Sequence, residues 1–305
     1  MNRHEEAIAK IIGETQKIIK GKEKQVRLSL AAFLAGGHVL IEDLPGVGKT
    51  TLAKTLARVL GLHYGRIQFT SDLLPSDILG VNYFDTKQSA FVFKKGPIFS
   101  QFLLADEINR ATPKTQSALL EAMEEAQVSV EGSALALERP FFVMATKNPF
   151  EEVGTFELPG SQLDRFLISF SLGYPDRDAE RTILAAQKPQ IEQVVQNVGS
   201  EVCEMLFAAV REVRLNDALL DYLQNVVAFT RESGLYRMPL STRGALALSK
   251  MTRAWALLEG RDYAIPADVK AVLPYVCAHR LVRREGKHDP QKISDEIFEA
   301  VPADE

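Results

Sequence analysis

The sequence predicts an α/β fold in which a layered domain built on a parallel sheet precedes a smaller, all-helical domain. Two observations indicate the layered domain: a strand, a glycine-rich turn and a helix follow one another over residues 39–51, and later apolar runs end in polar residues. Residues after 175 are rich in Ala, Leu, Glu and Arg and read as four or five helices. We therefore expect domains at 1–175 and 176–305.

Length and composition describe an ordinary globular protein. The 305 residues suffice for one large or two modest domains, and the net charge of −4 argues against a protein that mainly binds nucleic acid. No apolar run approaches the ~18 residues that span a bilayer, and the N-terminus lacks the pattern of a signal peptide. We expect a soluble, cytoplasmic protein without membrane insertion, in which Cys203 and Cys277 are separate buried thiols.

Two helices are expected before the first strand. Residues 4–20 carry isoleucines on roughly one helical face, and Gly21 ends that helix. A second helix, about 22–35, ends at Gly36. Packing accounts for most of this pattern, but Gly21 lies just before the first strand and could also line a pocket for a flat base.

The chain is organised around residues 39–51. Val39–Ile41 form a buried strand in this interpretation, and Lys49 opens a helix with apolar residues at helical spacing. Between them, Gly46 and Gly48 let backbone N–H groups turn toward phosphate oxygens, and the helix N-terminus adds partial positive charge. We expect nucleotide to be bound by the whole loop: Asp43, Leu44, Pro45, Gly46, Val47, Gly48, Lys49, Thr50 and Thr51.

Two side chains carry the chemistry of this loop. Lys49 would reach the β- and γ-phosphates, and the Thr50 hydroxyl would ligate Mg²⁺. Asp43 stands where the full pattern has glycine. We expect the turn to survive because Asp tolerates a left-handed backbone. The competing interpretation is an ordinary strand–turn–helix with a chance Gly-Lys-Thr.

Strands and two hairpins follow the loop helix. A helix is expected from Thr112 to about Ala126, and β-prone runs around turns predict hairpins at 81–93 and 127–137. The first hairpin interrupts the helix–strand alternation, so we interpret it as an insertion that carries function. Short apolar runs predict the remaining strands: 66–70, 102–105, 141–146 and 166–170.

Polar residues follow two of these strands. Asp106 and Glu107 follow the run at 102–105, and Asn148 follows the run at 141–146. Because the carboxyl ends of parallel strands face the ligand crevice, Asp106 could hold Mg²⁺ and Glu107 could accept a proton from an attacking water. Asn148 could orient that water. A loop-capping acidic strand end and a plain Asn-Pro turn are the competing interpretations.

Two arginines are candidates for contact with phosphate. Arg165 lies near the end of a short predicted helix, and Arg243 lies at a helix start, where it is poorly placed for the helix dipole. An arginine that contacts the γ-phosphate can raise the rate of phosphoryl transfer by ~10³–10⁵. Arg165 could instead pair with Asp164 or a helix-end carbonyl, so the residues alone leave both roles open.

These motifs, in this order, resemble those of the AAA+ ATPases and, within them, the MoxR family. The resemblance covers about residues 15–280. Asp43 matches a variant that MoxR proteins commonly show, whereas Lys147 stands where the family often has Gln. The resemblance rests on five segments: 42–50, 105–111, 145–149, 162–166 and 241–243.

The resemblance implies a P-loop AAA+ three-layer sandwich with a five-stranded parallel sheet, followed by an all-α lid. The hairpin within 81–93 matches the family's helix-2 insert, and the one at 127–137 matches its pre-sensor-1 hairpin. In similar proteins these hairpins face a central pore. The resemblance assigns five further features: Walker A at 43–50, Walker B at 102–107, sensor 1 at Asn148, an arginine finger at Arg165 and sensor 2 at Arg243.

The resemblance also implies Mg²⁺-dependent ATP hydrolysis in a homo-oligomeric ring, usually a hexamer, with ATP between subunits. Arg165 would act on the neighbour's γ-phosphate, and Arg243 could act in cis or in trans. Asn109 and Arg110 would face the same interface. MoxR proteins resemble chaperones that mature or remodel protein partners, often ones with a von Willebrand factor A domain.

Two other functions stay open. A nucleotide-gated scaffold would bind ATP but turn it over too slowly to do work. A nucleic-acid motor predicts basic hairpins; Lys87, Lys94 and Lys95 lie in or beside the first hairpin, but the second has Glu131 and no lysine. Nucleic acid is therefore the less favoured partner. No Asn-Lys-x-Asp motif reads the base, so adenine over guanine rests on the resemblance.

Overall fold

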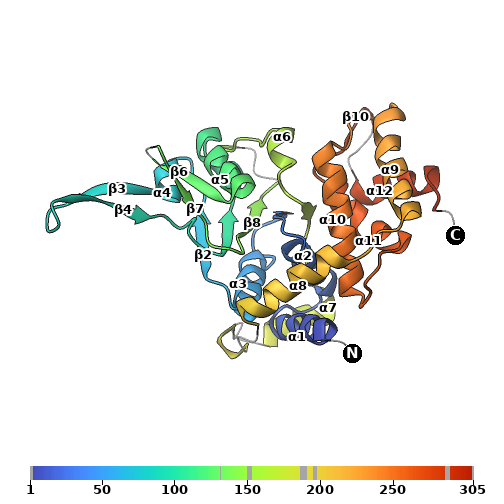
Figure 1. Ribbon diagram of the computed structural model, residues 1–305, viewed down its shortest axis with the longest axis horizontal. Helices are drawn as coiled ribbons and strands as arrows, with labels where there is room; N and C mark the ends of the chain where they lie inside the picture. The colour runs from blue at the N-terminus through green and yellow to red at the C-terminus, as the bar shows by residue number, and fades with distance from the viewer. Residues whose placement is uncertain are drawn as a thin grey trace.

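A five-stranded parallel sheet forms the centre of the protein, in the order β2-β5-β8-β1-β9 (Figure 1). The expected parallel five-stranded sheet is thus confirmed. Its strands are β1 (Val39–Glu42), β2 (Tyr64–Gln68), β5 (Phe102–Asp106), β8 (Phe142–Lys147) and β9 (Ile168–Phe170). The computed structural model describes residues 3–130, 132–149, 153–185, 191–194, 198–285 and 289–303.

Helices cover both faces of the sheet, which explains why the inner strands β1, β5 and β8 carry continuous apolar runs rather than an alternating pattern. Val39 and Ile41 of β1 pack into the hydrophobic core on one face, and Leu40 between them packs into the core on the other. The first face carries α1 (Arg3–Ile18), α2 (Glu23–Leu34), α3 (Lys49–Leu60) and α8 (Ser200–Glu212). The second face carries α4 (Pro75–Leu79) and α5 (Pro113–Glu125).

Two antiparallel hairpins stand outside the central sheet. One pairs β3 (Gly80–Asp85) with β4 (Ala90–Lys95), and the other pairs β6 (Gln127–Val130) with β7 (Ser133–Ala136). The β3–β4 hairpin extends far from the body of the molecule (Figure 1). Glu131, which the sequence places in the second turn, lies outside the described residues.

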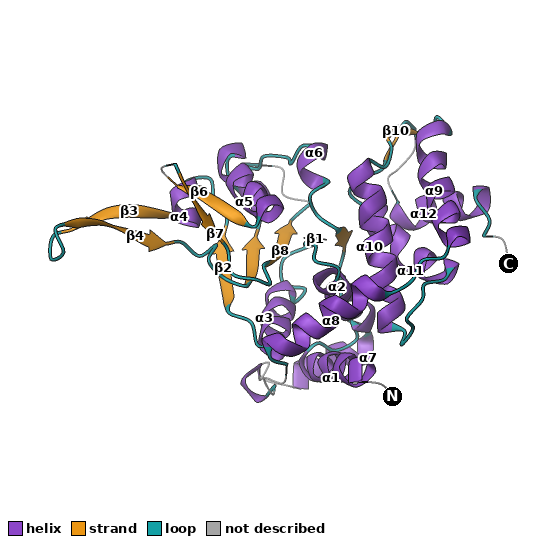
Figure 2. Ribbon diagram, in the orientation of Figure 1, coloured by secondary structure: helices purple, strands orange, loops and turns teal. Residues whose placement is uncertain are grey.

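The C-terminal part is mainly helical, as Figure 2 shows. Its described residues form six helices, one more than the upper expectation: α7 (Arg177–Ala185), α8, α9 (Asp217–Glu232), α10 (Thr242–Leu258), α11 (Pro266–Cys277) and α12 (Pro290–Ala300). They also form a small sheet that sequence reasoning missed, between β10 (Tyr236–Met238) and β11 (Val282–Arg283). Strands this short cannot show a period-two pattern, so tertiary pairing alone reveals them.

The two parts share one core. Cys203 of α8 lies against the backbone of Leu60 at the end of α3, although residue 175 separates them in the predicted domains. The division at 175 therefore stays a prediction. Cys203 and Cys277 are free and buried, as expected, and burial raises the pKa of their thiols to about 11 and about 12. Among the helices of the described ranges, none is both long and apolar enough to cross a membrane.

Candidate functional site

The carboxyl ends of β1, β5 and β8 surround a cavity of about 280 Å³. Three segments that are distant in sequence meet there because the three strands are neighbours in the sheet. Asn148, Asp106 and Glu107 reach the cavity as the strand positions predicted. The lining residues are Pro45, Gly46, Gly48, Lys49, Thr50, Thr51, Asp106, Glu107 and Asn148.

The glycines of the loop are required by backbone conformation. Gly46 and Gly48 have φ of 86° and 99°, in the left-handed region that disfavours side chains. A Cβ at either glycine would meet no atom within 4 Å, so the loop backbone faces open space. Gly48 also caps α3, whose first-turn N–H groups have no intrahelical partner. The loop is therefore an anion cradle with room for phosphate oxygens.

Lys49 lies within this loop rather than extending into solvent. Its ammonium donates to the carbonyl oxygens of Asp43 and Leu44, at 2.7 and 2.9 Å. Burial lowers the pKa of Lys49, and the negative charges of Asp43, Asp106 and Glu107 oppose that shift. Because an ammonium has three donors, one is left for a phosphate oxygen in the cavity.

Asp43 supports the loop in a way that sequence reasoning did not foresee. The turn forms as expected, but Asp43 does not adopt the left-handed backbone that the sequence argument invoked. The reason is that its N–H donates to Lys147 O at 3.1 Å and prolongs the β1–β8 pairing. Its carboxylate accepts hydrogen bonds from Leu44 N, Ser171 Oγ and Gly173 N, at 2.8, 2.8 and 2.7 Å. Asp43 thus ties the loop to the segment after β9.

Asp106 is held from two sides. Its Oδ1 accepts from Thr146 Oγ1 at 2.7 Å, and its Oδ2 pairs with Arg66 Nη2 at 2.7 Å. Thr146 lies on β8 and Arg66 on β2, the two strands beside β5. The sequence could have indicated Arg66 only if the position of β2 at the sheet edge had been known.

Glu107 adopts an unusual backbone conformation, with φ of 56°. Its N–H donates to Thr146 Oγ1 at 2.8 Å, which fixes this turn. Its Oε2 accepts from Gln68 Nε2 at 2.8 Å and lies 3.1 Å from Arg110 Nε. Asp106 and Glu107 therefore each pair with an arginine of the same chain.

Asn109 and Arg110 differ from the expectation that both face an interface. They lie in a 3₁₀ turn, Ile108–Arg110, directly after Glu107. Arg110 is partly exposed, but Asn109 is only 1% exposed, so its side chain is closed to a neighbour. Among the described residues, neither amide atom of Asn109 has a hydrogen-bond partner.

Arg165 and Arg243 lie away from this cavity. They line a second cavity of about 290 Å³, to which Gly37 and His38 also contribute just before β1. That position is the amino end of β1, opposite the phosphate loop. No described residue lines both cavities.

One carboxylate lies between the two arginines. Arg243 donates a hydrogen bond to Glu124 Oε1, and Arg165 Nε lies 3.2 Å from Glu124 Oε2. The Arg165 N–H does not point at that oxygen, so this second contact is an ion pair without a hydrogen bond. The alternative pairing of Arg165 with Asp164 does not occur, because Asp164 is engaged by Arg280.

Comparison with known proteins identifies the family. The sequence pattern of the ATPase family associated with various cellular activities matches residues 38–168, and that of the AAA lid domain matches residues 228–300. The chaperone MoxR1 of Mycobacterium tuberculosis is 42% identical over 287 residues, 90% of this chain and 75% of that protein. The chain belongs to the MoxR family of AAA+ ATPases.

Two further relatives resemble this MoxR-family chain over nearly its whole length. The YeaC protein of Bacillus subtilis is 45% identical, over 96% of this chain and 94% of that protein. A crystal structure from Cytophaga hutchinsonii has 34% sequence identity and a TM-score of 0.91, over 99% of this chain and 96% of that chain. The MoxR-like fold thus extends through the helical lid.

Gly21 is the one predicted nucleotide contact that lies on a different element from the loop. Its φ is 66°, and a Cβ there would lie 2.9 Å from Ala179 Cβ and 3.0 Å from Asp176 Oδ2. The glycine allows the end of α1 to pack closely on the start of α7. Gly21 is not among the residues that line the phosphate-loop cavity.

The phosphate-loop cavity fits the Mg²⁺–nucleotide that AAA+ membership implies. Thr50, in the first turn of α3, and Asp106 both line it and offer the oxygen ligands that Mg²⁺ prefers. The open glycine backbone and Lys49 supply donors for phosphate. The donor set is therefore appropriate for a nucleoside triphosphate with its metal ion.

Proposed function

We propose that this MoxR-family protein is a cytoplasmic, Mg²⁺-dependent ATPase that works as a homo-oligomeric ring, expected to be a hexamer. One observation carries the proposal: the phosphate loop and the paired arginines lie at opposite ends of the same sheet. β1 has four residues, so roughly 13 Å of strand separates the two ends. The arginines would serve a neighbouring subunit's ATP.

Within one subunit, the phosphate-loop cavity would bind ATP. Thr50 and Asp106 would hold Mg²⁺, which neutralises charge that develops on the phosphates. Glu107 would accept the proton of the attacking water, and Asn148 would orient that water. Lys49 would contact the β- and γ-phosphates. Each role is supported by the position of the side chain at one cavity.

Between subunits, Arg165 and Arg243 would complete the site in trans. Both would exchange the carboxylate of Glu124 for the neighbour's γ-phosphate, which carries more negative charge. The ion pair between Arg165 and Glu124 lacks hydrogen-bond geometry, so Arg165 would lose little interaction free energy when it leaves Glu124. A finger of this kind contributes ~10³–10⁵ to the rate of phosphoryl transfer.

ATP turnover would be coupled to remodelling of a protein partner. MoxR1 of Mycobacterium tuberculosis is named a chaperone, and we carry that role over, with a von Willebrand factor A domain as the expected kind of client. The β3–β4 hairpin supports a protein client rather than nucleic acid. It exposes apolar side chains on both of its faces: Val81 and Tyr83 on one, and the cross-strand pair Phe84 and Phe91 on the other.

A nucleotide-gated scaffold with little turnover is the second candidate. It is favoured by the ion pairs of Arg66 with Asp106 and of Arg110 with Glu107, because both carboxylates are engaged by the subunit itself. Turnover requires these contacts to open when Mg²⁺ and water arrive. The scaffold predicts ATP binding without appreciable hydrolysis.

The test is ATPase activity per subunit against protein concentration, with Mg²⁺ and saturating ATP. A steep rise to a plateau is expected, because the sites form only on assembly. Mixing Lys49→Ala with Arg165→Ala should then restore activity that each variant lacks alone, since the first supplies the finger and the second binds ATP. Concentration-independent activity in a monomer would contradict the ring, and no activity at any concentration favours the scaffold.

A further inference from the structure

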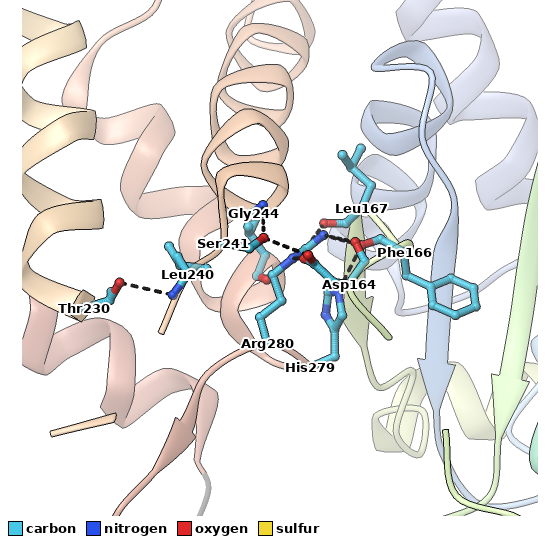
Figure 3. A network of polar contacts seen from close by, with 10 residues as sticks. Asp164, Phe166, Leu167, Thr230, Leu240, Ser241, Gly244, His279 and Arg280 are labelled. Carbon is cyan, nitrogen blue, oxygen red and sulfur yellow. Dashed lines mark hydrogen bonds and ion pairs between the residues drawn. The ribbon is translucent and has the colours of Figure 1, made fainter. Parts of the chain in front are cut away.

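Arg280, just after α11, is a buried arginine that lines the second cavity together with Arg165 and Arg243. It is only 5% exposed, yet its guanidinium contacts the segment that carries Arg165 (Figure 3). Its Nε donates to Asp164 Oδ1 at 2.7 Å, and its Nη2 donates to Asp164 O at 3.1 Å and Phe166 O at 2.5 Å. Its Nη1 donates to Leu167 O at 2.9 Å and Val276 O at 2.8 Å.

The same carboxylate connects this arginine to the start of α10. Asp164 Oδ2 accepts a hydrogen bond from Ser241 Oγ at 2.7 Å, while Ser241 caps α10 by accepting from Gly244 N at 2.9 Å (Figure 3). Arg243 lies between these two residues on the first turn. A Cβ at Gly244 would lie 3.2 Å from Arg280 Cδ, so this turn also packs on the Arg280 stem.

The network fixes the backbone around Arg165 but leaves its side chain out. Residues 164, 166 and 167 are all bound by Arg280, and His279 Nε2 lies 3.0 Å from Phe166 O. Arg165 points instead to Glu124 in the second cavity. Burying a guanidinium is unfavourable unless its donors are satisfied. The fully engaged Arg280 is therefore a specific connection rather than incidental packing.

We propose that Arg280 is a positioning residue that joins the Arg165 segment to the lid through Asp164 and Ser241, so that Arg165 and Arg243 meet a neighbour's phosphate as one rigid unit. This inference rests on the proposed action of the two arginines in trans. Arg280 itself would contact neither nucleotide nor metal, because its guanidinium is buried and its Nε, Nη1 and Nη2 all donate to acceptors within the protein.

The first expected effect is on turnover. Arg280→Ala should lower kcat about 10²-fold, the loss that follows a displacement of about 1 Å in a catalytic group. The Kd for ATP of the same variant should not change, since the phosphate loop is untouched. Arg280→Lys should recover part of the loss of kcat. An ammonium can pair with Asp164 but cannot reproduce the several directed hydrogen bonds of the planar guanidinium.

Arg261→Ala is the matched control. Arg261 also lies in the lid and makes a bidentate pair, with the buried Asp268, at 2.7 and 2.5 Å. It has no contact with the segment at 164–167. We expect its loss to destabilise the lid and leave kcat unchanged. An equal fall of kcat in both variants would mean that Arg280 matters only for stability.

Subunit mixing separates positioning from general damage. Arg280→Ala mixed with Lys49→Ala should regain activity, because the second variant donates a correctly held finger to the intact loop of the first. Arg280→Ala mixed with Arg165→Ala should not. If the first mixture stays inactive while Arg165→Ala with Lys49→Ala recovers, Arg280 is not a positioning residue. If the mixture of Arg165→Ala with Lys49→Ala also stays inactive, the proposed action of the arginines in trans is wrong, and so is the role inferred for Arg280.

Ser241 provides a second set of variants if Arg280→Ala does not fold. Ser241 is exposed, and both Asp and Asn cap helices well. Ser241→Asp keeps the cap but places a negative charge against Asp164, whereas Ser241→Asn can still donate to it. Only Ser241→Asp should lower kcat, and mixing with Lys49→Ala should restore it. Equal kcat in the two variants would overturn the proposal.

Discussion

The two ends of the central sheet have opposite chemistry. At the carboxyl end, one subunit assembles a phosphate loop, two carboxylates and an amide around one cavity. At the amino end, the same subunit gathers Arg165 and Arg243 around Glu124, with no phosphate loop nearby. We propose that the first end binds the nucleotide and that the second end stabilises the charged transition state in a neighbouring subunit.

The two ends are also held differently. The loop end depends on Lys49 and Asp43, whose partners lie in the loop itself and in the segment just after β9, before the helical lid. The arginine end depends on Arg280 of the lid, whose partners Asp164, Phe166 and Leu167 lie more than a hundred residues away in the sequence. Binding should therefore survive changes in the lid that abolish turnover.

The largest effect is expected at the loop. Lys49→Ala removes the ammonium that would contact the phosphates, so ATP binding and hydrolysis should both be lost. Binding is measured with a fluorescent ATP analogue and hydrolysis by phosphate release. Lys54→Ala, an exposed lysine on the same helix α3, should behave as wild type. Retained binding in Lys49→Ala would mean that the cavity is not the nucleotide site.

The matching change at the arginine end should affect only turnover. Arg165→Ala should lower kcat by ~10³–10⁵ and leave the Kd for ATP unchanged. Steady-state kinetics and equilibrium binding on one preparation test both statements. Arg211→Ala, an exposed arginine on α8, serves as control. A parallel loss of binding would place Arg165 in its own subunit's site.

Glu107→Gln should lower turnover by ~10²–10⁴ because the amide cannot accept the proton of water. ATP affinity should be kept, since Lys49 and the loop remain. Single-turnover hydrolysis and nucleotide binding give the two values, with the exposed Glu121→Gln on α5 as control. Normal hydrolysis by Glu107→Gln would exclude it as the base.

Asp43→Ala should destabilise the loop end by about 2–3 kcal/mol, because three donors lose a charged acceptor. The shift of the urea midpoint measures this loss. Ser171→Ala removes only one of those donors and should lower the free energy of unfolding by about 1 kcal/mol. A double-mutant cycle should show strong coupling between the two; additive effects would contradict the connection.

The last prediction concerns the pH dependence of stability at the arginine end. His38 is buried, and desolvation lowers its pKa from 6.5 to about 4. Its Nδ1 accepts from Val143 N at 3.0 Å, so Nε2 carries the hydrogen donated to Met123 O at 3.0 Å. Between pH 6.5 and 4 the imidazole of His38 is therefore protonated in the unfolded chain but stays neutral in the folded chain. Stability should fall there by up to about 1.4 kcal/mol per pH unit as pH decreases.

Urea unfolding of wild type at pH 7, 6 and 5 tests this, with His38→Gln as the variant without the group. The slope should be smaller in His38→Gln than in wild type. Identical slopes in wild type and His38→Gln would show that the imidazole titrates alike in both states. Above about pH 7.5, where the imidazole is neutral in the unfolded chain as well, His38 should contribute almost no pH dependence.

Local sequence was enough to predict the elements that hold the nucleotide. Apolar runs flanked by glycine and acidic residues are short-range signals, and the α/β class, the five parallel strands and the helical lid all followed from them or from the resemblance. The phosphate loop was predictable residue by residue because its function resides in consecutive backbone N–H groups.

The tertiary structure alone decided which side chains meet from distant segments. The partners of Asp43, the contacts of Arg66 and Gln68 with the two carboxylates, and the grouping of Arg165 with Arg243 depend on strand order and lid position. The hydrophobic periodicity of the sequence carries no information on strand order or on the position of the lid. Hydrophobic burial is non-directional, so it determines which residues are inside but not which neighbours they contact. Only the packed chain specifies those contacts.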